Sequence, residues 1–297
     1  MSQSVLTAVL LPVALGIIML GLGLSLSLAD FKRVLVYPRA VLVGLFCQMA
    51  LLPLACFGIA VAFELPGPLA VGLMLLAASP GGTTANLYSH LYKGDVALNV
   101  TLTAVNSLLS LFALPFIVNF ALSHFMGTST TLPLQFDKVA QVFAIVLGPV
   151  SIGMVIRARW PSVALRLDKP VRIASAVFLV LIIAATLIKE REHVLGYFQQ
   201  VGLPALVFNL ASMGVGYVIP RLLRVNARQS IAIGMEVGIH NGTLAMAIAL
   251  SPTLLNNDAM AIPAAVYSLI MFFTAAAFGW LVSRRVRSLT AAEAARP

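Results

Sequence analysis

The 297-residue sequence contains few charged side chains. Only 10% of its residues are Asp, Glu, Lys or Arg, whereas a typical soluble domain has about 25%. The hydrophobic fraction is 60% and the mean hydropathy is +1.00. This composition excludes an ordinary soluble domain and indicates an integral membrane protein. Cysteine is scarce too, and Cys47 and Cys56 lie too far apart along one apolar segment to form a disulfide, so we expect both to be packing residues.

Long polar connections are also missing, and apolar runs fill most of the chain. A helix needs about 20 apolar residues to cross a hydrocarbon core of roughly 30 Å. The sequence contains nine such segments, near 5–28, 38–62, 68–92, 96–123, 138–158, 171–188, 200–220, 229–250 and 260–283. No connection is long enough to hold a folded soluble domain. The sequence therefore predicts an all-α membrane protein with nine transmembrane helices.

Basic residues fall mostly on one side of this arrangement. Of the 19 Lys and Arg residues, all but Lys138, Lys189 and Arg191 lie in alternate connections or in the C-terminal segment. The positive-inside rule then places the C-terminus in the cytoplasm and the N-terminus outside a plasma or inner membrane. The net charge of +9 reflects this orientation and an attraction to anionic membrane lipid. We expect no nucleic-acid partner, and the sequence carries no signal for an oligomeric state.

The third predicted span, 68–92, contains helix breakers at membrane depth. Its sequence SPGGTTAN places Pro80 and two glycines in the middle of an apolar run. Irregular backbone survives at this depth only where it is buried in protein or lines a wet cavity. We expect Thr83 and Thr84 to cap a second half-helix, whose N-terminal amides would point at the membrane centre and attract an anion. The alternative is a Pro/Gly kink without function.

The eighth predicted span, 229–250, is also interrupted, and it carries a carboxylate. The sequence MEVGIHNGT places Glu236, His240 and Asn241 among glycines. A charged group near the bilayer centre is costly unless it is solvated, paired or bound to a cation, so it marks a functional site by default. Glu236 is the only acidic residue that we predict at such depth. The alternative is a Glu neutralised by a proton or by a polar neighbour.

The two breaks occupy corresponding positions in two halves of the chain. Because they lie five spans apart, the interrupted segments cross the membrane in opposite directions, as in an inverted five-helix repeat whose first copy lacks its opening helix. We predict a first repeat of four spans in 1–125, a second of five spans in 137–285, and a cytoplasmic tail in 286–297. Paired interrupted spans of this kind point to the midplane site of a secondary transporter.

The span after the first break carries a stripe of polar side chains. Asn99, Thr103, Asn106 and Ser110 recur at three or four residues and therefore share one helix face. Such a stripe in lipid requires a partner, which is either a bound ligand or a neighbouring helix joined by small polar residues. Both alternatives remain open at this point.

Two long stretches together resemble a known transporter family. They are SPGGTTANLYSHLYKGDVALNVTLTAVNS and MEVGIHNGTLAMAIAL, and with the lead-in LGIIMLGLGLSLSLADFKRVLVYPRAVLVGLFCQ they are similar to the bile acid:sodium symporter family over nearly the whole chain. The resemblance implies a panel domain and a core domain in which two broken helices cross. It also implies sodium-coupled uptake of an organic anion, either bile-acid-like or a small carboxylate, without enzymatic activity.

The resemblance also implies site residues by position. Sodium ions prefer oxygen ligands. One sodium site would use Asn86, Asn99, Thr103 and Glu236, and a second would use Gln48, Glu236, the carbonyls of Val237 and Ile239, and His240. Substrate contacts would come from Thr83, Thr84, Asn106 and Asn241.

Two positions depart from the family pattern. Ala85 stands where many members have Ser, and His240 stands where Gln is usual. An imidazole nitrogen suits sodium poorly, so we predict a weak or absent second sodium site, with a proton as its possible replacement because an ordinary imidazole titrates near pH 6.5. The alternative is that His240 only donates a hydrogen bond to Glu236 or to a neighbouring carbonyl.

The sequence thus predicts sodium-coupled symport of an organic anion by alternating access, with proton-coupled transport of an organic acid as the alternative. Two other classes fit the sequence less well. An intramembrane hydrolase would need a nucleophile and base at depth, and Ser79 with His240 lacks an orienting acid besides Glu236. A ligand-sensing receptor normally adds a soluble signalling domain, and no predicted connection is long enough to hold one. The expected partners are the organic anion, its coupling ion and membrane lipid.

Overall fold

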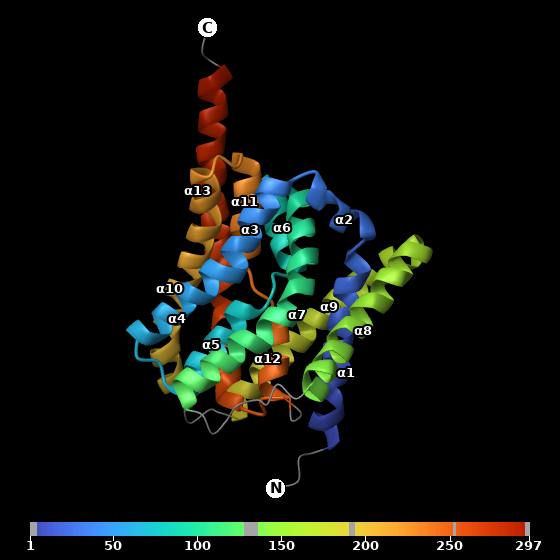
Figure 1. Cartoon of the computed structure of the whole chain (residues 1–297), viewed down its shortest axis with the longest axis vertical. Helices are drawn as coiled ribbons and strands as arrows, with labels where there is room; N and C mark the ends of the chain where they lie inside the picture. Colours follow the sequence, from blue (N-terminus) through green and yellow to red (C-terminus); the bar gives the residue numbers. More distant parts are fainter. Residues whose placement is uncertain (1–4, 128–135, 190–193, 252–253, 295–297) are drawn as a thin grey trace.

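The computed structural model describes residues 5–127, 136–189, 194–251 and 254–294, and these ranges are almost entirely helical (Figure 1). The helices are α1 (Val5–Ser25), α2 (Leu28–Lys32), α3 (Pro38–Phe46), α4 (Leu52–Ala62), α5 (Gly67–Ala78), α6 (Thr83–Leu91), α7 (Val96–Met126), α8 (Phe136–Arg159), α9 (Pro161–Lys189), α10 (Val194–Leu222), α11 (Ala227–Gly238), α12 (Gly242–Leu250) and α13 (Asp258–Ala294). A π-helical turn, Cys47–Leu51, joins α3 to α4. Pro53 follows this turn and has no N–H to donate, which accounts for the wider turn before it.

Every predicted span corresponds to a helix or to a pair of short helices. Within the described residues, four helical segments are by themselves long and apolar enough to cross a membrane: Pro38–Ala62, Val96–Met126, Gly196–Leu222 and Asp258–Arg284. Both interrupted spans are pairs of half-helices, α5 with α6 and α11 with α12. The prediction of an all-helical membrane protein with two broken helices is confirmed, while the count of nine spans and the inverted repeat stay predictions.

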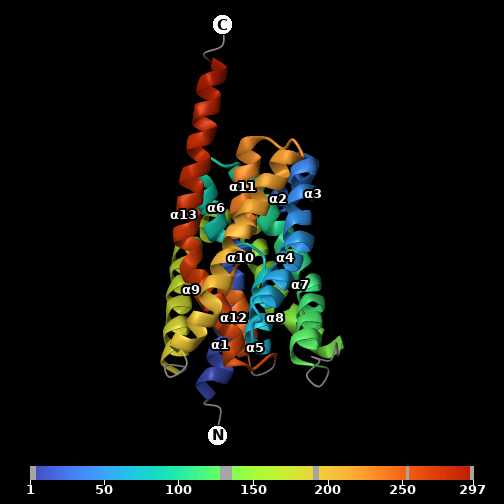
Figure 2. The same ribbon diagram turned by 90° about the vertical axis from the view of Figure 1, so that its left-hand side faces the viewer.

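Two helices extend beyond their predicted apolar ranges. α9 begins at Pro161, well before the predicted 171, because Pro suits the first helical position and the charged residues that follow continue the helix outside the apolar run. α13 continues to Ala294 through the segment predicted as a tail, whose Ala, Glu and Arg residues favour helix. Figure 2 shows this helix running along the bundle and continuing past it.

The helices pack in two groups. α1 packs against α8 and α9, which lie together on one side in Figure 1, and the other group surrounds the half-helices. Glycines bring backbones together in both groups: a Cβ at Gly23 on α1 would overlap the backbone of Val150 on α8, and one at Gly72 on α5 would overlap the backbone of Met260 on α13. Small residues at such contacts are typical of helix packing in membranes.

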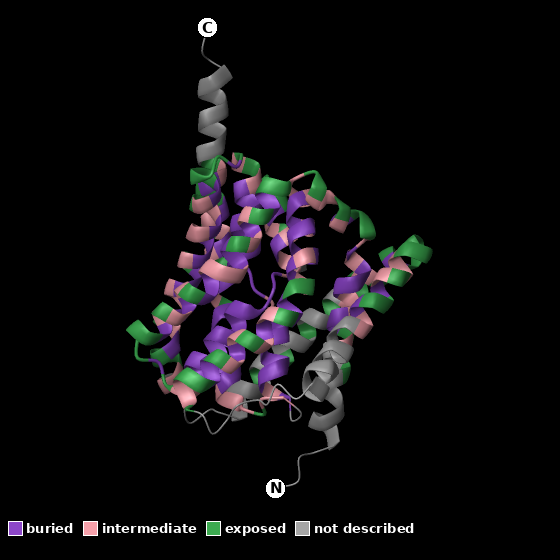
Figure 3. Cartoon of the chain, in the orientation of Figure 1, coloured by how far each residue is buried: buried purple, intermediate pink, exposed green. Residues whose placement is uncertain are grey.

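Buried residues concentrate around the two breaks (Figure 3). In α5 every residue from 69 to 78 is buried, and in α11 every residue from 230 to 238 is buried. A helix that is buried all round is enclosed by other helices and not by lipid. The half-helices therefore meet the condition under which broken backbone is tolerated inside a membrane.

Both cysteines are free and buried, as predicted. Cys47 lies in the π-helical turn and Cys56 one helical stretch later in α4, and each is 0% exposed. They fill space between helices, so they behave as small apolar side chains.

Candidate functional site

The two breaks cross at the centre of the buried group. The Asn241 N–H donates to the Pro80 carbonyl over 2.9 Å, and Gly81 and His240 form an antiparallel bridge. Each break thereby satisfies part of the other's exposed backbone, which lipid could not do. The ends of four half-helices meet at this crossing: the C-termini of α5 and α11, and the N-termini of α6 and α12.

The N-termini of the two outgoing half-helices are capped differently. α6 begins at Thr83 after Gly82, so Thr83 and Thr84 lie in its first turn, and the predicted capping role of these threonines is wrong. The Thr83 side chain lies outside the described residues, and Thr84 is half-buried. α12 begins after Asn241, whose side-chain oxygen accepts the Leu244 N–H at 3.0 Å. This is the usual capping arrangement for Asn.

Glu236 lies at the crossing with its side chain fully buried. Its Oε2 accepts a hydrogen bond from the Thr103 hydroxyl over 2.6 Å, and its Oε1 accepts one from the Asn106 amide over 3.3 Å. Both donors are neutral and come from α7. Among the described residues no basic side chain forms an ion pair with Glu236, whose side-chain partners are Thr103 and Asn106. The carboxylate therefore has donors but no counter-charge.

The polar stripe of α7 supplies amide oxygens beside this carboxylate. The Nδ2 of Asn99 donates to the Ala232 carbonyl on α11 over 2.6 Å, and the Nδ2 of Asn106 donates to Glu236. These bonds fix which end of each amide is nitrogen. They leave Asn99 Oδ1 and Asn106 Oδ1 buried without a hydrogen-bond partner. Asn86 Oδ1 on α6 is also buried and also lacks a partner.

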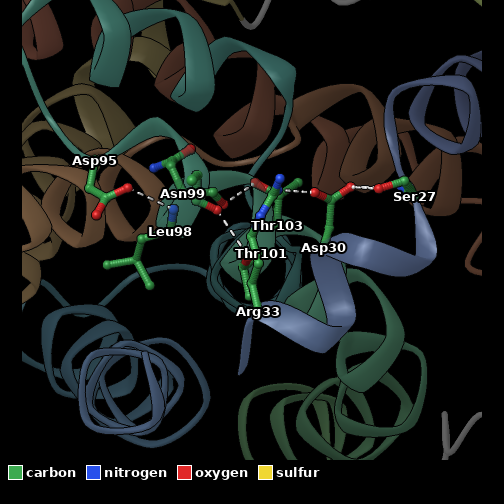
Figure 4. A network of polar contacts seen from close by, with 9 residues as sticks. Ser27, Asp30, Arg33, Asp95, Leu98, Asn99, Thr101 and Thr103 are labelled. Atoms are coloured by element: carbon green, nitrogen blue, oxygen red, sulfur yellow. Dashed lines mark hydrogen bonds and ion pairs between the residues drawn. The ribbon is translucent and has the colours of Figure 1, made fainter. Parts of the chain in front are cut away.

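Buried polar atoms without partners are rare and require an explanation. Among the described residues five buried amide oxygens lack a partner, and three of them belong to Asn86, Asn99 and Asn106 on helices that pack against α11. Asn106 bonds the Glu236 carboxylate, which has no counter-charge. A hard cation binds carboxylate, amide and hydroxyl oxygens. Figure 4 shows the start of α7, where Asp95 caps the helix through the Leu98 N–H, and Thr103 lies one turn after Asn99. The structure thus brings together Asn99, Thr103 and Asn106 with Glu236.

A second group of predicted residues surrounds the Ser79 carbonyl. Gln48 Nε2 donates to this carbonyl over 3.3 Å, and His240 Nδ1 lies 3.1 Å from it. Because a carbonyl can only accept, Nδ1 carries a hydrogen. Gln48 Oε1 and His240 Nε2 remain buried without partners. Of the two roles considered for His240, this geometry supports the hydrogen bond to a neighbouring carbonyl. Val237 and Ile239 are buried beside it at the end of α11.

Gly81 touches the carboxylate directly. A Cβ at this position would lie 2.5 Å from Glu236 Oε1 and 2.8 Å from Oε2, whereas one at Gly82 would meet nothing within 4 Å. The first break therefore requires glycine at one of its two positions because a side chain there would collide with Glu236. The sequence shows the two glycines but not which one faces the carboxylate.

A cavity of about 300 Å³ lies between the two helix groups and reaches the crossing at Pro80 and Asn241. Its lining is mostly apolar and comes from α1, α2, α7, α8 and α12, with hydroxyls from Ser107, Ser110 and Ser151. Of the predicted substrate residues, Asn241 lines it, while Thr84 and Asn106 are not among the lining residues that the structure describes. Sequence reasoning missed Ser107 and Ser151. Ser107 lies four residues after Thr103 and three before Ser110, so the spacing of the α7 stripe could have found it. Ser151 is an isolated hydroxyl in an apolar part of α8 and carries little signal.

A multi-pass helical membrane protein in which two broken helices cross beside buried, unpartnered oxygen atoms has the architecture typical of secondary transporters. The comparisons agree with this class. The sequence model described as the Sodium Bile acid symporter family matches residues 12–197. This chain is therefore a member of the sodium bile acid symporter family, a family of transporters and not of enzymes.

Curated relatives come from bacteria, animals and plants. The uncharacterized sodium-dependent transporter YocS of Bacillus subtilis is 30% identical over 260 residues, which cover 86% of this chain and 77% of the relative. The ileal sodium/bile acid cotransporter of Oryctolagus cuniculus is 26% identical over 82% of this chain and 70% of its own length. The probable chloroplastic sodium/metabolite cotransporter BASS1 of rice is 29% identical over 86% of this chain and 61% of its own length.

Proposed function

We propose that this protein is a sodium-coupled symporter that imports an organic anion by alternating access. The observation that carries the proposal is the Glu236 carboxylate, which has no counter-charge at the crossing and is bonded by Thr103 and Asn106. Buried oxygens of Asn86, Asn99 and Asn106 on the adjoining helices α6 and α7 lack hydrogen-bond partners. The names of the relatives, which include sodium-dependent and sodium/bile acid transporters, support the same ion.

Sodium would bind first where oxygen atoms are most numerous. Asn86, Asn99 and Thr103 would join Glu236 in one site. Gln48, His240 and the carbonyls of Val237 and Ile239 would surround a second position with the same carboxylate, and this position would bind sodium weakly or not at all because of the His240 imidazole. An unneutralised Glu236 inside the membrane is costly. A bound cation cancels that charge. The helices around the crossing would therefore move within the bilayer at a lower free-energy cost with sodium bound than without it. This difference couples the ion to transport.

The anion would bind at the cavity beside the crossing. None of the lining residues that the structure describes is basic, so the negative charge would be met by the N-terminal amides of α6 and α12, each at the start of a helix of nine residues. The apolar lining would hold the rest of the molecule. A bile-acid-like anion or a smaller carboxylate with an apolar body fits this chemistry.

Movement of the two helix groups would expose the cavity to each side in turn. α1, α8 and α9 would form the panel domain, and the helices around the crossing would form the core domain. The cavity lies between these groups, so a relative displacement changes its access without breaking the crossing. We propose the orientation predicted from the basic residues, with the C-terminus in the cytoplasm.

Purified protein in sealed liposomes tests the proposal. An inward sodium gradient should drive accumulation of a radiolabelled organic acid above its external concentration, and an equal potassium gradient should not. The sodium ionophore monensin should abolish accumulation. Equal uptake with sodium and potassium gradients would contradict sodium coupling, turnover of the acid without accumulation would indicate an enzyme, and binding alone would indicate a sensor.

Proton-coupled transport is the second candidate, and His240 is the reason to test it. Its Nε2 is buried without a partner and is free to accept a proton. In that case an inward pH gradient should drive uptake in the absence of sodium, and His240→Gln should abolish this uptake while leaving any sodium-driven uptake. Failure of a pH gradient to drive wild-type uptake would exclude this candidate.

A further inference from the structure

The Gly238 carbonyl lies at the C-terminal end of α11, where the second break begins. Carbonyls in the last turn of a helix have no partner within the helix. An unpaired carbonyl inside a membrane protein costs several kcal/mol, and Gly238 is buried. A hydrogen-bond donor from another helix must therefore pair with this carbonyl.

Two unbroken helices supply donors to this carbonyl. The Tyr267 hydroxyl on α13 donates to it over 2.9 Å, and the Asn209 amide on α10 donates to it over 3.0 Å. Both side chains are 0% exposed. The Thr274 hydroxyl lies 2.5 Å from Asn209 Oδ1, which orients the amide so that its nitrogen faces Gly238.

The same two helices also hold the next part of the break. The His240 ring stacks on Phe208 of α10, with centroids 5.7 Å apart and an interplanar angle of 14°. It meets the Tyr267 ring edge-on, with centroids 5.4 Å apart. Residues 238 to 240 are thus held from both sides by α10 and α13, through a peptide carbonyl and through an aromatic ring.

The first break is anchored less independently. The Ser79 carbonyl also has two donors, Gln48 and His240, but His240 belongs to the second break. The position of the first break therefore depends in part on His240, whose own position depends on Phe208 and Tyr267. The contacts at Gly238 and His240 therefore bear on both breaks.

We propose that Asn209 and Tyr267 are positioning residues for the coupling cation. By fixing the Gly238 peptide, they hold Glu236, two residues earlier, in line with Thr103 and Asn106 of α7. The inference rests on the proposed sodium coupling and extends it to residues that touch neither ion nor substrate. Because Asn209, Gly238 and Tyr267 are not among the described lining residues of the cavity, they should affect the cation and not the anion.

Tyr267→Phe tests the proposal most directly because it removes the hydroxyl and keeps the ring against His240. We expect the sodium concentration for half-maximal uptake to rise about three- to tenfold, as for the loss of one hydrogen bond. The KM for the anion at saturating sodium should stay within about twofold. A role in folding alone would lower the yield of protein without separating these two constants.

Tyr88→Phe is the matched control. The Tyr88 hydroxyl also donates to a backbone carbonyl, that of Phe272, over 2.9 Å, but this bond joins α6 to α13 at an exposed position. Its loss should leave the sodium dependence unchanged. An equal shift in the two variants would overturn the proposal, because it would then reflect general loosening of the helices.

Thr274→Val provides a second test that does not alter Gly238 directly. It removes the hydroxyl that orients Asn209 and keeps the branched shape, so we expect a smaller rise in the sodium constant than with Tyr267→Phe. In the double variant both donors to Gly238 are weakened, and the rise should exceed the product of the single effects. Sodium constants that do not move in either single variant overturn the inference, whereas a wild type without sodium dependence overturns the proposed function itself.

Discussion

Replacing Gly81 by Ala is the sharpest test of the site, because one methyl group would be placed against the carboxylate. The new Cβ would lie 2.5 Å from Glu236 Oε1 and 2.6 Å from Cδ, where ordinary contacts begin at 3.4 Å. The shortfall is about 0.9 Å at the nearest oxygen. Gly81 has no left-handed backbone angle, so the effect is a collision and not backbone strain.

The size of the effect follows from the bonds that Glu236 makes. The Thr103 bond of 2.6 Å and the Asn106 bond of 3.3 Å leave little room for the carboxylate to retreat and keep both. A hydrogen bond to a charged group contributes about 1.5–3 kcal/mol. If the displacement removes one such interaction from the cation-bound state, sodium affinity should fall about ten- to a hundredfold.

Sodium titrations of uptake in liposomes measure this directly, with Gly82→Ala as the control. Ala at position 82 would have nothing within 4 Å of its Cβ, and the backbone there is extended at φ −134°. Its sodium dependence should match the wild type within about twofold, although the two glycines are adjacent. If both variants lose sodium affinity equally, or neither does, the placement of Glu236 against Gly81 is not the source of the effect.

Three further substitutions probe the crossing. Glu236→Gln should fold and insert, because a neutral amide is easier to bury than a carboxylate, yet lose sodium-driven uptake; uptake at the wild-type rate would refute the ion site. His240→Gln adds an amide oxygen at the second position, so the sodium Hill coefficient should rise from about one toward two, and any dependence on pH between about 5.5 and 7.5 should flatten; a wild-type coefficient near two at every pH would refute this. Asn241→Ala removes the cap of α12 and should destabilise the protein by about 1 kcal/mol, which would lower its melting temperature in detergent. Asn241→Ser keeps a capping oxygen and should retain most of the wild-type stability. Identical melting temperatures of the two variants would count against the cap.

Local sequence features determined the helical framework and the two breaks. Apolar runs, Pro80 and the glycines act over a few residues, so their consequences are readable without knowledge of the rest of the chain. The stripe on α7 was visible for the same reason, since Asn99, Thr103 and Asn106 share a helix face by spacing alone. Boundaries at charged segments were less accurate, because the apolar pattern of α9 ends before its helix does.

The tertiary structure decided which of these features meet. Thr103 and Asn106 donate to Glu236 across 133 and 130 residues of sequence, a separation at which no local pattern specifies a contact. No local pattern specifies the close approach of Gly81 to Glu236 either, nor the hydrogen bonds that Asn209 and Tyr267 donate to the Gly238 carbonyl. The sequence alone predicted a carboxylate among glycines and two broken helices. The packing of distant helices determined which atoms surround them. Unpartnered oxygens exist only once every neighbour has been placed, and for that reason the candidate cation site became visible only in three dimensions.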